Sequence, residues 1–286
     1  PFSSEKYPFN LKSIYDPPLV LYIKGTIEKK DTIALAIVGS RRCSYYGQSQ
    51  AVKFSRQLAQ IGLCIVSGMA RGIDTNAHLG AINGKGRTIA VLGCGLSTVY
   101  PQENRELMGK IASHGAVISE LPMNTHPHSR NFSPINRIIS GLSLGVLVIE
   151  STLMSGSLIT ARWALEQGKE VFALPGNIDS NYSRGTNGLI KEGAKLVEEI
   201  NDIIEELGPL AETLNIGDNK KIEDMRSLTL NVQENKIFSL LSSTPKNIDE
   251  ITLESGVPVS NVTSILLILE VRKLVKQLSG NRFVKS

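Results

Sequence analysis

The segment from residue 39 to residue 41 combines residue types that suit the binding of an anion. Gly39, Ser40 and Arg41 follow an apolar run with high β-propensity and precede a helical pattern. Glycine lets a ligand come close to the backbone, the N-terminus of a helix favours an anion, and arginine holds a phosphate through two parallel hydrogen bonds. An ordinary turn with a surface arginine is the alternative interpretation, and this segment alone favours neither.

Similar segments follow several other apolar runs, between the end of a predicted strand and the start of a helix. Small residues there leave the first backbone N–H groups of the helix open to an anion. One such loop is weak evidence, but several at one edge of a sheet predict a phosphate-binding pocket. The candidate residues are Ser67, Gly68, Arg71, Ser155, Gly156, Ser157, Gly185 and Asn187. Asp74, at the start of the helix after Arg71, is interpreted as a helix cap.

An aromatic residue stands among basic residues in the segment from 130 to 137. Phe132 lies between Arg130 and Arg137, and Asn136 precedes the second arginine. An exposed ring between two arginines suits stacking on a nucleic-acid base flanked by phosphate contacts. A phenylalanine packed in the core below a loop is the competing interpretation.

Residues for catalysis or metal binding are poorly represented. Glu120 and Glu150 end predicted strands and could act as acid and base, but no nucleophile accompanies them. His126 and His128 lack a second cluster of ligands, and the three cysteines form no CxxC pair. We therefore expect no catalytic residue, no metal site, no cofactor and no disulfide framework.

Apolar runs that alternate with helical patterns must position these segments. Runs that are apolar on both faces suit strands covered by helices on each side, and their separation leaves room for one helix each. The sequence therefore predicts an α/β fold with a doubly wound, mostly parallel sheet. Open sheets of this kind bind ligands at the carboxyl ends of their strands, where the candidate segments lie. The predicted strands are 33–38, 63–66, 88–92, 116–118, 146–149 and 171–174.

The C-terminal part has a different pattern. Helical stretches at 232–242, 248–255 and 260–271 precede a strand–turn–strand from 273 to 285, the order of a winged helix. Residues 256–271 contain no Lys or Arg, so reading of duplex DNA through that helix is not favoured. A wing contact with phosphate and a protein–protein role both stay open.

Length and charge agree with two domains. The chain has 286 residues and a net charge of +4, but residues 1–195 carry 21 Lys and Arg against 13 Asp and Glu, a balance of +8. We expect a sheet domain at 1–207 with an extended lead-in at 1–30, a linker at 208–230 and a winged-helix domain at 231–286. No apolar run approaches the roughly 20 residues of a membrane span, so we expect a soluble, cytoplasmic protein without membrane contact.

Taken in order, these motifs resemble the DNA-processing protein A (DprA, or Smf) family. The matching segments are 38–41, 66–74, 90–95 with Tyr100 and Pro101, 119–122, 136–143, 155–161 and 171–176. The resemblance implies an extended Rossmann-like fold that binds single-stranded DNA in the predicted pocket and performs no known reaction. It also implies a homodimer that loads the RecA recombinase onto DNA during natural transformation.

The resemblance assigns roles to several residues. Arg41 matches the arginine of the family that grips DNA, Phe132 matches a position that contacts bases, and Asn136 with Arg137 matches the Asn-Arg pair of the family motif. The family usually has Phe-Pro-x-Arg before that pair, whereas here Phe132 is followed by Ser-Pro-Ile. One basic contact is therefore missing, and Arg130 is its candidate replacement.

A nucleotide-binding, Rossmann-like hydrolase is the alternative. Proteins similar to phosphoribohydrolases carry a Pro-Gly-Gly-x-Gly-Thr loop followed by a glutamate. Residues 155–161, in the comparable place here, read Ser-Gly-Ser-Leu-Ile-Thr-Ala and lack both. The sequence therefore favours a protein that binds single-stranded DNA without strong sequence preference.

Overall fold

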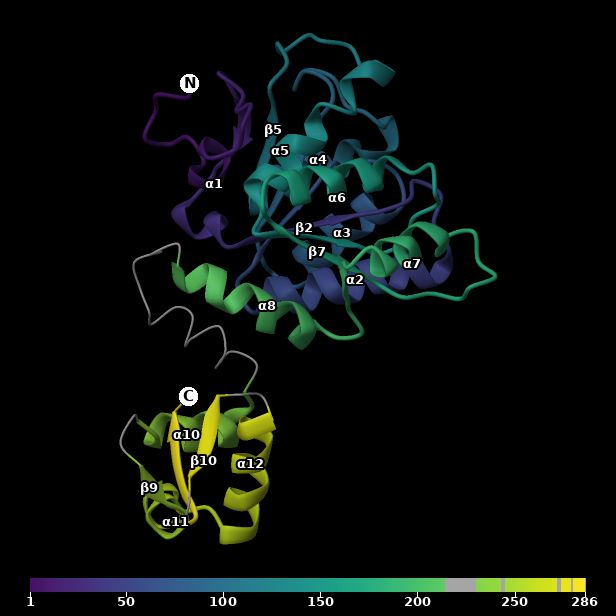
Figure 1. Ribbon diagram of the computed structural model, residues 1–286. Coiled ribbons are helices and arrows are strands. Elements are labelled where there is room, and N and C mark those ends of the chain that lie inside the picture. The colour runs from purple at the N-terminus through teal and green to yellow at the C-terminus, as the bar shows by residue number, and fades with distance from the viewer. Residues whose placement is uncertain (214–229, 243–244, 272–273, 279, 286) are drawn as a thin grey trace. The chain divides into compact units, whose positions relative to one another are not determined.

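The computed structural model describes residues 1–213, 230–242, 245–271, 274–278 and 280–285. The chain forms two compact units, residues 1–216 and 217–286 (Figure 1), and each is described by itself. The predicted linker, 208–230, begins inside a helix that continues to Thr213, and its residues 214–229 lie outside the described residues.

An eight-stranded sheet forms the centre of the first unit, in the order β1-β5-β4-β3-β2-β6-β7-β8. All neighbouring pairs are parallel except β1 and β5, so the prediction of a doubly wound, mostly parallel sheet is confirmed. The direction of winding reverses between β2 and β6, which makes this pair the topological switch point. The strands are β1 (Tyr22–Gly25), β2 (Ala34–Val38), β3 (Cys64–Ser67), β4 (Thr88–Val91), β5 (Gly115–Ser119), β6 (Gly145–Val148), β7 (Glu170–Ala173) and β8 (Lys195–Leu196).

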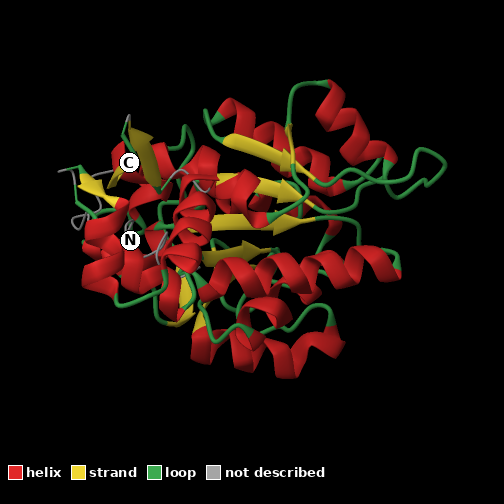
Figure 2. Ribbon diagram, turned by 90° about the horizontal axis from the view of Figure 1, so that it is seen from below, coloured by secondary structure: helices red, strands yellow, loops and turns green. Residues whose placement is uncertain are grey.

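Helices cover both faces of this sheet (Figure 2). Ile89 and Val91 of β4 belong to the core cluster that includes residues of α1, α5 and α6, whereas the intervening Ala90 belongs to the cluster that includes residues of α4, because successive strand residues point to opposite faces. The α-helices are α1 (Phe9–Lys12), α2 (Tyr45–Gln60), α3 (Ile73–Asn83), α4 (Arg105–His114), α5 (Ile135–Leu142), α6 (Gly156–Glu166), α7 (Arg184–Lys191) and α8 (Ile200–Thr213). Short 3-10 helices are η1 (Lys29–Thr32), η2 (Gln102–Asn104) and η3 (Ser129–Asn131).

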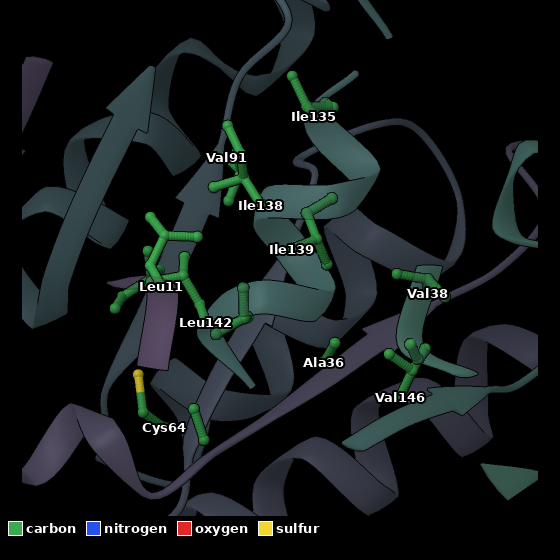
Figure 3. Packing of buried hydrophobic residues seen from close by; sticks show 14 of the residues in the cluster. Leu11, Ala36, Val38, Cys64, Val91, Ile135, Ile138, Ile139, Leu142 and Val146 are labelled. Atoms are coloured by element: carbon green, nitrogen blue, oxygen red, sulfur yellow. The ribbon is translucent and has the colours of Figure 1, made fainter. Parts of the chain in front are cut away.

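The core on one face is centred on α5 (Figure 3). Ile135, Ile138, Ile139 and Leu142 lie on one side of this helix because they are spaced three or four residues apart, and they face alternate residues of β2. Burial of each such side chain contributes about 1.5–3 kcal/mol. This contact fixes the start of α5, which lies beside the candidate loops.

The lead-in at residues 1–30 is more than an extended segment, so this prediction is partly wrong. It contains α1 and the edge strand β1, which pairs antiparallel with β5 from Tyr22 opposite Ser119 to Gly25 opposite Ala116. The buried Asn10 also donates hydrogen bonds from Nδ2 to the carbonyl oxygens of Thr32 (2.7 Å) and Leu142 (3.0 Å). Both elements are four residues long, too short for a clear periodicity in the sequence.

The second unit has the predicted order of a winged helix. It comprises α10 (Val232–Leu240), β9 (Lys246–Asn247), α11 (Ile248–Ser255), α12 (Val259–Val271), β10 (Val275–Leu278) and β11 (Arg282–Lys285). Its sheet has the order β10-β11-β9, and the two-residue β9 was not predicted. A small core of its own includes Ile237, Ile251, Leu266 and Phe283.

Among the described residues, no single helix has the length and apolar composition to cross a membrane. The helix α11 and α12 up to Glu270 meet that criterion only as a pair, and they are bent by 112°.

The variant Asn10→Ala tests how firmly the N-terminal segment is joined to the sheet. We expect it to lower the free energy of unfolding by about 1–3 kcal/mol, because one buried and one partly buried carbonyl group lose their donor. Trp163, the one tryptophan of the chain, lies in α6, so its fluorescence during urea denaturation reports on this unit. Tyr15→Ala, a change at a fully exposed residue of the same segment, is the matched control. Equal urea midpoints for Asn10→Ala and Tyr15→Ala would contradict the role of Asn10 in joining the N-terminal segment to the sheet.

Candidate functional site

A cavity of about 630 Å³ opens at the carboxyl ends of the strands, at the switch point between β2 and β6. Its lining comes from the loops after β2, β3, β6 and β7 and from the segment before α5. Predicted residues that line it are Gly39, Ser40, Arg41, Gly68, Phe132, Asn136, Ser155, Gly156 and Ser157. The structure thus brings together residues that are more than 100 positions apart in the sequence.

Arg41 and Phe132 form one contact in this wall. The guanidinium carbon of Arg41 lies 4.9 Å from the centroid of the Phe132 ring, a cation–π distance. Phe132 also lies 5.5 Å, centroid to centroid, from Tyr100 and packs against the main core. Arg41 is exposed and has no salt bridge to a carboxylate of the described residues, so its N–H groups are available to an anion.

The backbone of the Arg41 loop is held from two sides. Gly72 lies behind it with φ of +76°, and a Cβ there would come within 2.4 Å of the Ser40 carbonyl oxygen. On the other side, the Ser40 N–H donates to the Glu150 carbonyl oxygen at 2.8 Å. The Glu150 carboxylate accepts from the N–H (2.8 Å) and the hydroxyl (2.5 Å) of Ser44, the N-cap of α2. Glu150 therefore positions the loop.

Hydroxyl groups line the floor of the cavity. The Ser40 hydroxyl is buried and has no hydrogen-bond partner among the described residues. Ser155 caps α6 by accepting from the Ser157 N–H at 3.3 Å, and the first turn of this helix opens into the cavity. The N-terminus of an α-helix attracts anions through its free N–H groups and its dipole.

Asp74 is the one carboxylate among the residues that line the cavity, and it is almost fully buried. It is not the cap of α3, which is Gly72, but accepts from the N–H groups of Gly68 (3.1 Å) and Ala70 (3.3 Å). Burial raises the pKa of Asp74 to about 7, against the effect of these N–H donors, the Ser67 hydroxyl and the Arg41 charge. The cavity therefore becomes more positive when Asp74 is protonated.

Two predicted arginines form ion pairs outside this lining. Arg137 is buried and donates to Glu120 (2.7 Å) and Asp16 (3.0 Å), so it joins the N-terminal segment to α5. Arg71 pairs with Glu103 on the surface. The third, Arg130, is exposed on η3 near the cavity without lining it.

The remaining predicted residues support the loops. The Ser67 hydroxyl is buried and donates to the Ile37 carbonyl oxygen at 2.7 Å, and the Gly185 N–H donates to that of Ser151 at 2.7 Å. The side chain of Asn187 holds the backbone of Gly176. Its Oδ1 accepts from the Gly176 N–H at 3.1 Å, and its Nδ2 donates to the Gly176 carbonyl oxygen at 2.9 Å. These residues shape the cavity without facing it.

Sequence reasoning missed Arg42, Thr152, Met154 and Tyr182, which also line the cavity. Arg42 could have been found, because it directly follows Arg41 at the start of the same loop. Met154 and Tyr182 stand in loops without a sequence pattern that marks them.

His126 and His128, the two histidines considered for a metal site, are not part of a group of metal ligands among the described residues. Nδ1 of His128 accepts from the Arg130 N–H at 3.3 Å. Over the described part of the chain, no group of three or more His, Cys, Asp or Glu side chains could hold a metal ion.

Comparisons with known proteins give a consistent result. The family described as "DNA recombination-mediator protein A" matches residues 1–208, and "DprA winged helix domain" matches residues 223–281. The chain is 47% identical to DNA processing protein DprA of Bacillus subtilis over 209 residues, which cover 72% of this chain and 70% of that protein. It is 48% identical to protein Smf of Escherichia coli over 208 residues, 72% of this chain and 56% of that protein.

Two solved structures are similar to the first unit. The crystal structure of DNA processing protein A from Streptococcus pneumoniae has a TM-score of 0.68 and 43% identity and covers 71% of each chain. The protein of the same name from Helicobacter pylori, whose mode of binding single-stranded DNA is known, has a TM-score of 0.66 and 33% identity. That match covers 73% of this chain and 95% of the other.

Asp74→Asn should make the stability of the first unit less dependent on pH. The carboxyl has a pKa of about 7 in the folded protein and 3.8 ordinarily, so the folded state holds the extra proton over this range. Its stabilising contribution is complete below the ordinary pKa and is lost as the pH rises through about 7. We expect the urea midpoint of the wild-type protein to fall as the pH rises from 5 to 8, and to fall less in Asp74→Asn. An equal fall in the two proteins would contradict the raised pKa of Asp74.

Proposed function

Because the chain belongs to the DNA recombination-mediator protein A family, we propose that its switch-point cavity binds single-stranded DNA without strong sequence preference. The observation that carries the proposal is that two exposed arginines, Arg41 and Arg42, line one cavity together with the N-terminus of α6. Neither arginine forms an ion pair with a described residue. These groups suit phosphates, since both supply N–H donors and positive charge. The Helicobacter pylori relative, which binds single-stranded DNA, supports the same ligand for this chain.

The lining also accounts for the expected lack of base specificity. Arginine contacts to phosphate and stacking on rings tolerate every base. Asn136 is the one carboxamide among the lining residues, so few groups could read the edge of a base. Unpaired strands should bind better than duplex, since stacking on a ring requires a base free of its partner.

The wider role is proposed from the family. We propose that the protein acts in the cytoplasm as a homodimer and loads RecA recombinase onto the bound strand during natural transformation. We propose a role of binding and not of catalysis. In support, the two carboxylates considered for acid–base chemistry are engaged in structural contacts, Glu120 with Arg137 and Glu150 with Ser44.

Arg41→Ala tests the cavity. We expect weaker binding of every oligonucleotide sequence alike, and a slope of log K against log salt that is smaller by about 1, because one phosphate contact is lost. The measurement is fluorescence anisotropy of a labelled oligonucleotide across a salt series. Arg56→Ala, which removes an exposed arginine of α2 outside the cavity, is the matched control. Unchanged binding by Arg41→Ala would exclude this cavity as the site.

Stimulation of RecA-dependent strand exchange tests the wider role. We expect the full chain to stimulate the reaction and Arg41→Ala to do so less. A protein shortened at about residue 226 should retain stimulation, because every residue of the cavity lies in the first unit. Absence of stimulation by the full chain would contradict the loading role, and hydrolysis of nucleoside monophosphates by the purified protein would support the enzyme alternative.

A further inference from the structure

We propose that Tyr182, with Met154 beside the same cavity, is a second platform for DNA bases, separate from the contact between Arg41 and Phe132. This inference rests on the proposed function. Both residues line the cavity but come from the loops after β7 and β6, whereas Arg41 comes from the loop after β2. Since β2 and β6 are the two sides of the switch point, the second platform belongs to the other half of the sheet.

The backbone of Tyr182 is fixed at the end of β6. The Ser151 N–H donates to the Tyr182 carbonyl oxygen at 2.7 Å, and the Gly185 N–H donates back to the Ser151 carbonyl oxygen at 2.7 Å. The Tyr182 N–H donates to the Ser180 hydroxyl at 3.2 Å. The ring therefore projects from a held backbone, as a pre-organised binding group requires.

The ring of Tyr182 has no partner of its own. The residue is 38% exposed, and its side chain makes no hydrogen bond and no contact with another ring or a cation within the described residues. Phe132 differs, because Arg41 and Tyr100 already contact its ring and the core packs against it. Tyr182 is thus the aromatic residue of the lining whose ring is free to stack.

Apolar exposure continues along the same two loops. Met154 is 94% exposed, and Leu153 and Ile178 are 62% and 81% exposed. Met154 lines the cavity together with Tyr182, and a methionine side chain adapts its shape to flat groups. Met154 and Tyr182 therefore give this part of the lining exposed apolar surface that a ligand can cover.

The charge of the cavity identifies the ligand. Arg41, Arg42 and the N-terminus of α6 require anionic groups, and Tyr182 with Met154 requires flat apolar groups in the same ligand. Nucleotides of a single strand present both, since phosphates and bases alternate. A strand that contacts both platforms crosses the switch point and places more than one nucleotide in the cavity.

The test is a thermodynamic cycle that changes two things, the Tyr182 side chain and the bases of the oligonucleotide, and compares the binding free energies. Wild type, Tyr182→Ala and Tyr182→Phe are titrated with a labelled oligo-dT and with an oligonucleotide of the same length whose sugars carry no bases. We expect Tyr182→Ala to bind oligo-dT more weakly by on the order of tenfold, Tyr182→Phe to restore most of that loss, and the loss to vanish on the abasic strand. Tyr15→Ala, at an exposed tyrosine outside the cavity, is the matched control.

Salt dependence separates this inference from the proposed function. Tyr182→Ala should leave the slope of log K against log salt unchanged, because stacking releases no counterions, whereas Arg41→Ala lowers the slope. Wild-type affinity for oligo-dT retained by Tyr182→Ala, or an equal loss on both strands, would overturn the platform while the DNA site stands. Absence of salt-dependent binding by the wild type would instead overturn the proposed function.

Discussion

Glu150 joins the two halves of the sheet at the point where the cavity forms. Its carbonyl oxygen accepts from Ser40 and its carboxylate accepts twice from Ser44, so the end of β6 holds both the Arg41 loop and the start of α2. Gly72 closes the loop from behind with a backbone conformation that other residues rarely adopt. The backbone that carries Arg41 and the shape of the cavity beside it depend on this contact.

The basic residues of the first unit have two separate roles, which a count of charges in the sequence does not distinguish. Arg137 is buried between Glu120 and Asp16, and Lys169 donates to three carbonyl oxygens at the end of α5, at 2.6–2.8 Å. These cations hold elements together and offer little to a ligand. Arg41 and Arg42 are exposed and form no ion pair within the described part of the chain, so they are the cations that remain available for the proposed phosphate contacts. The placement of the cations, more than the balance of +8, therefore describes the binding surface.

Much of the fold follows from the sequence because each central strand is a continuous apolar run that ends in small polar residues. The loops at 39–41 and 155–157 could be predicted to meet, since the carboxyl ends of parallel strands share one edge. The edge strands β1 and β8, of four and two residues, are too short for a pattern. Arg137 looks like a DNA contact in the sequence because its partners, Asp16 and Glu120, become its neighbours only in the folded chain. Tyr182 gives no sequence signal because only the fold brings its loop to the cavity.

The hydrogen bond from Asn10 to the Leu142 carbonyl oxygen spans 132 positions of the chain, and β1 pairs with a strand that ends at Ser119. During synthesis, residues near position 10 leave the ribosome long before either partner exists. Their contacts with β5 and α5 can form only after those elements have emerged. This N-terminal segment therefore reaches its final place only after the residues up to Leu142 have been made. Slow or paused translation before residue 142 would prolong the time during which the apolar side of α1 is open to chaperones and proteases.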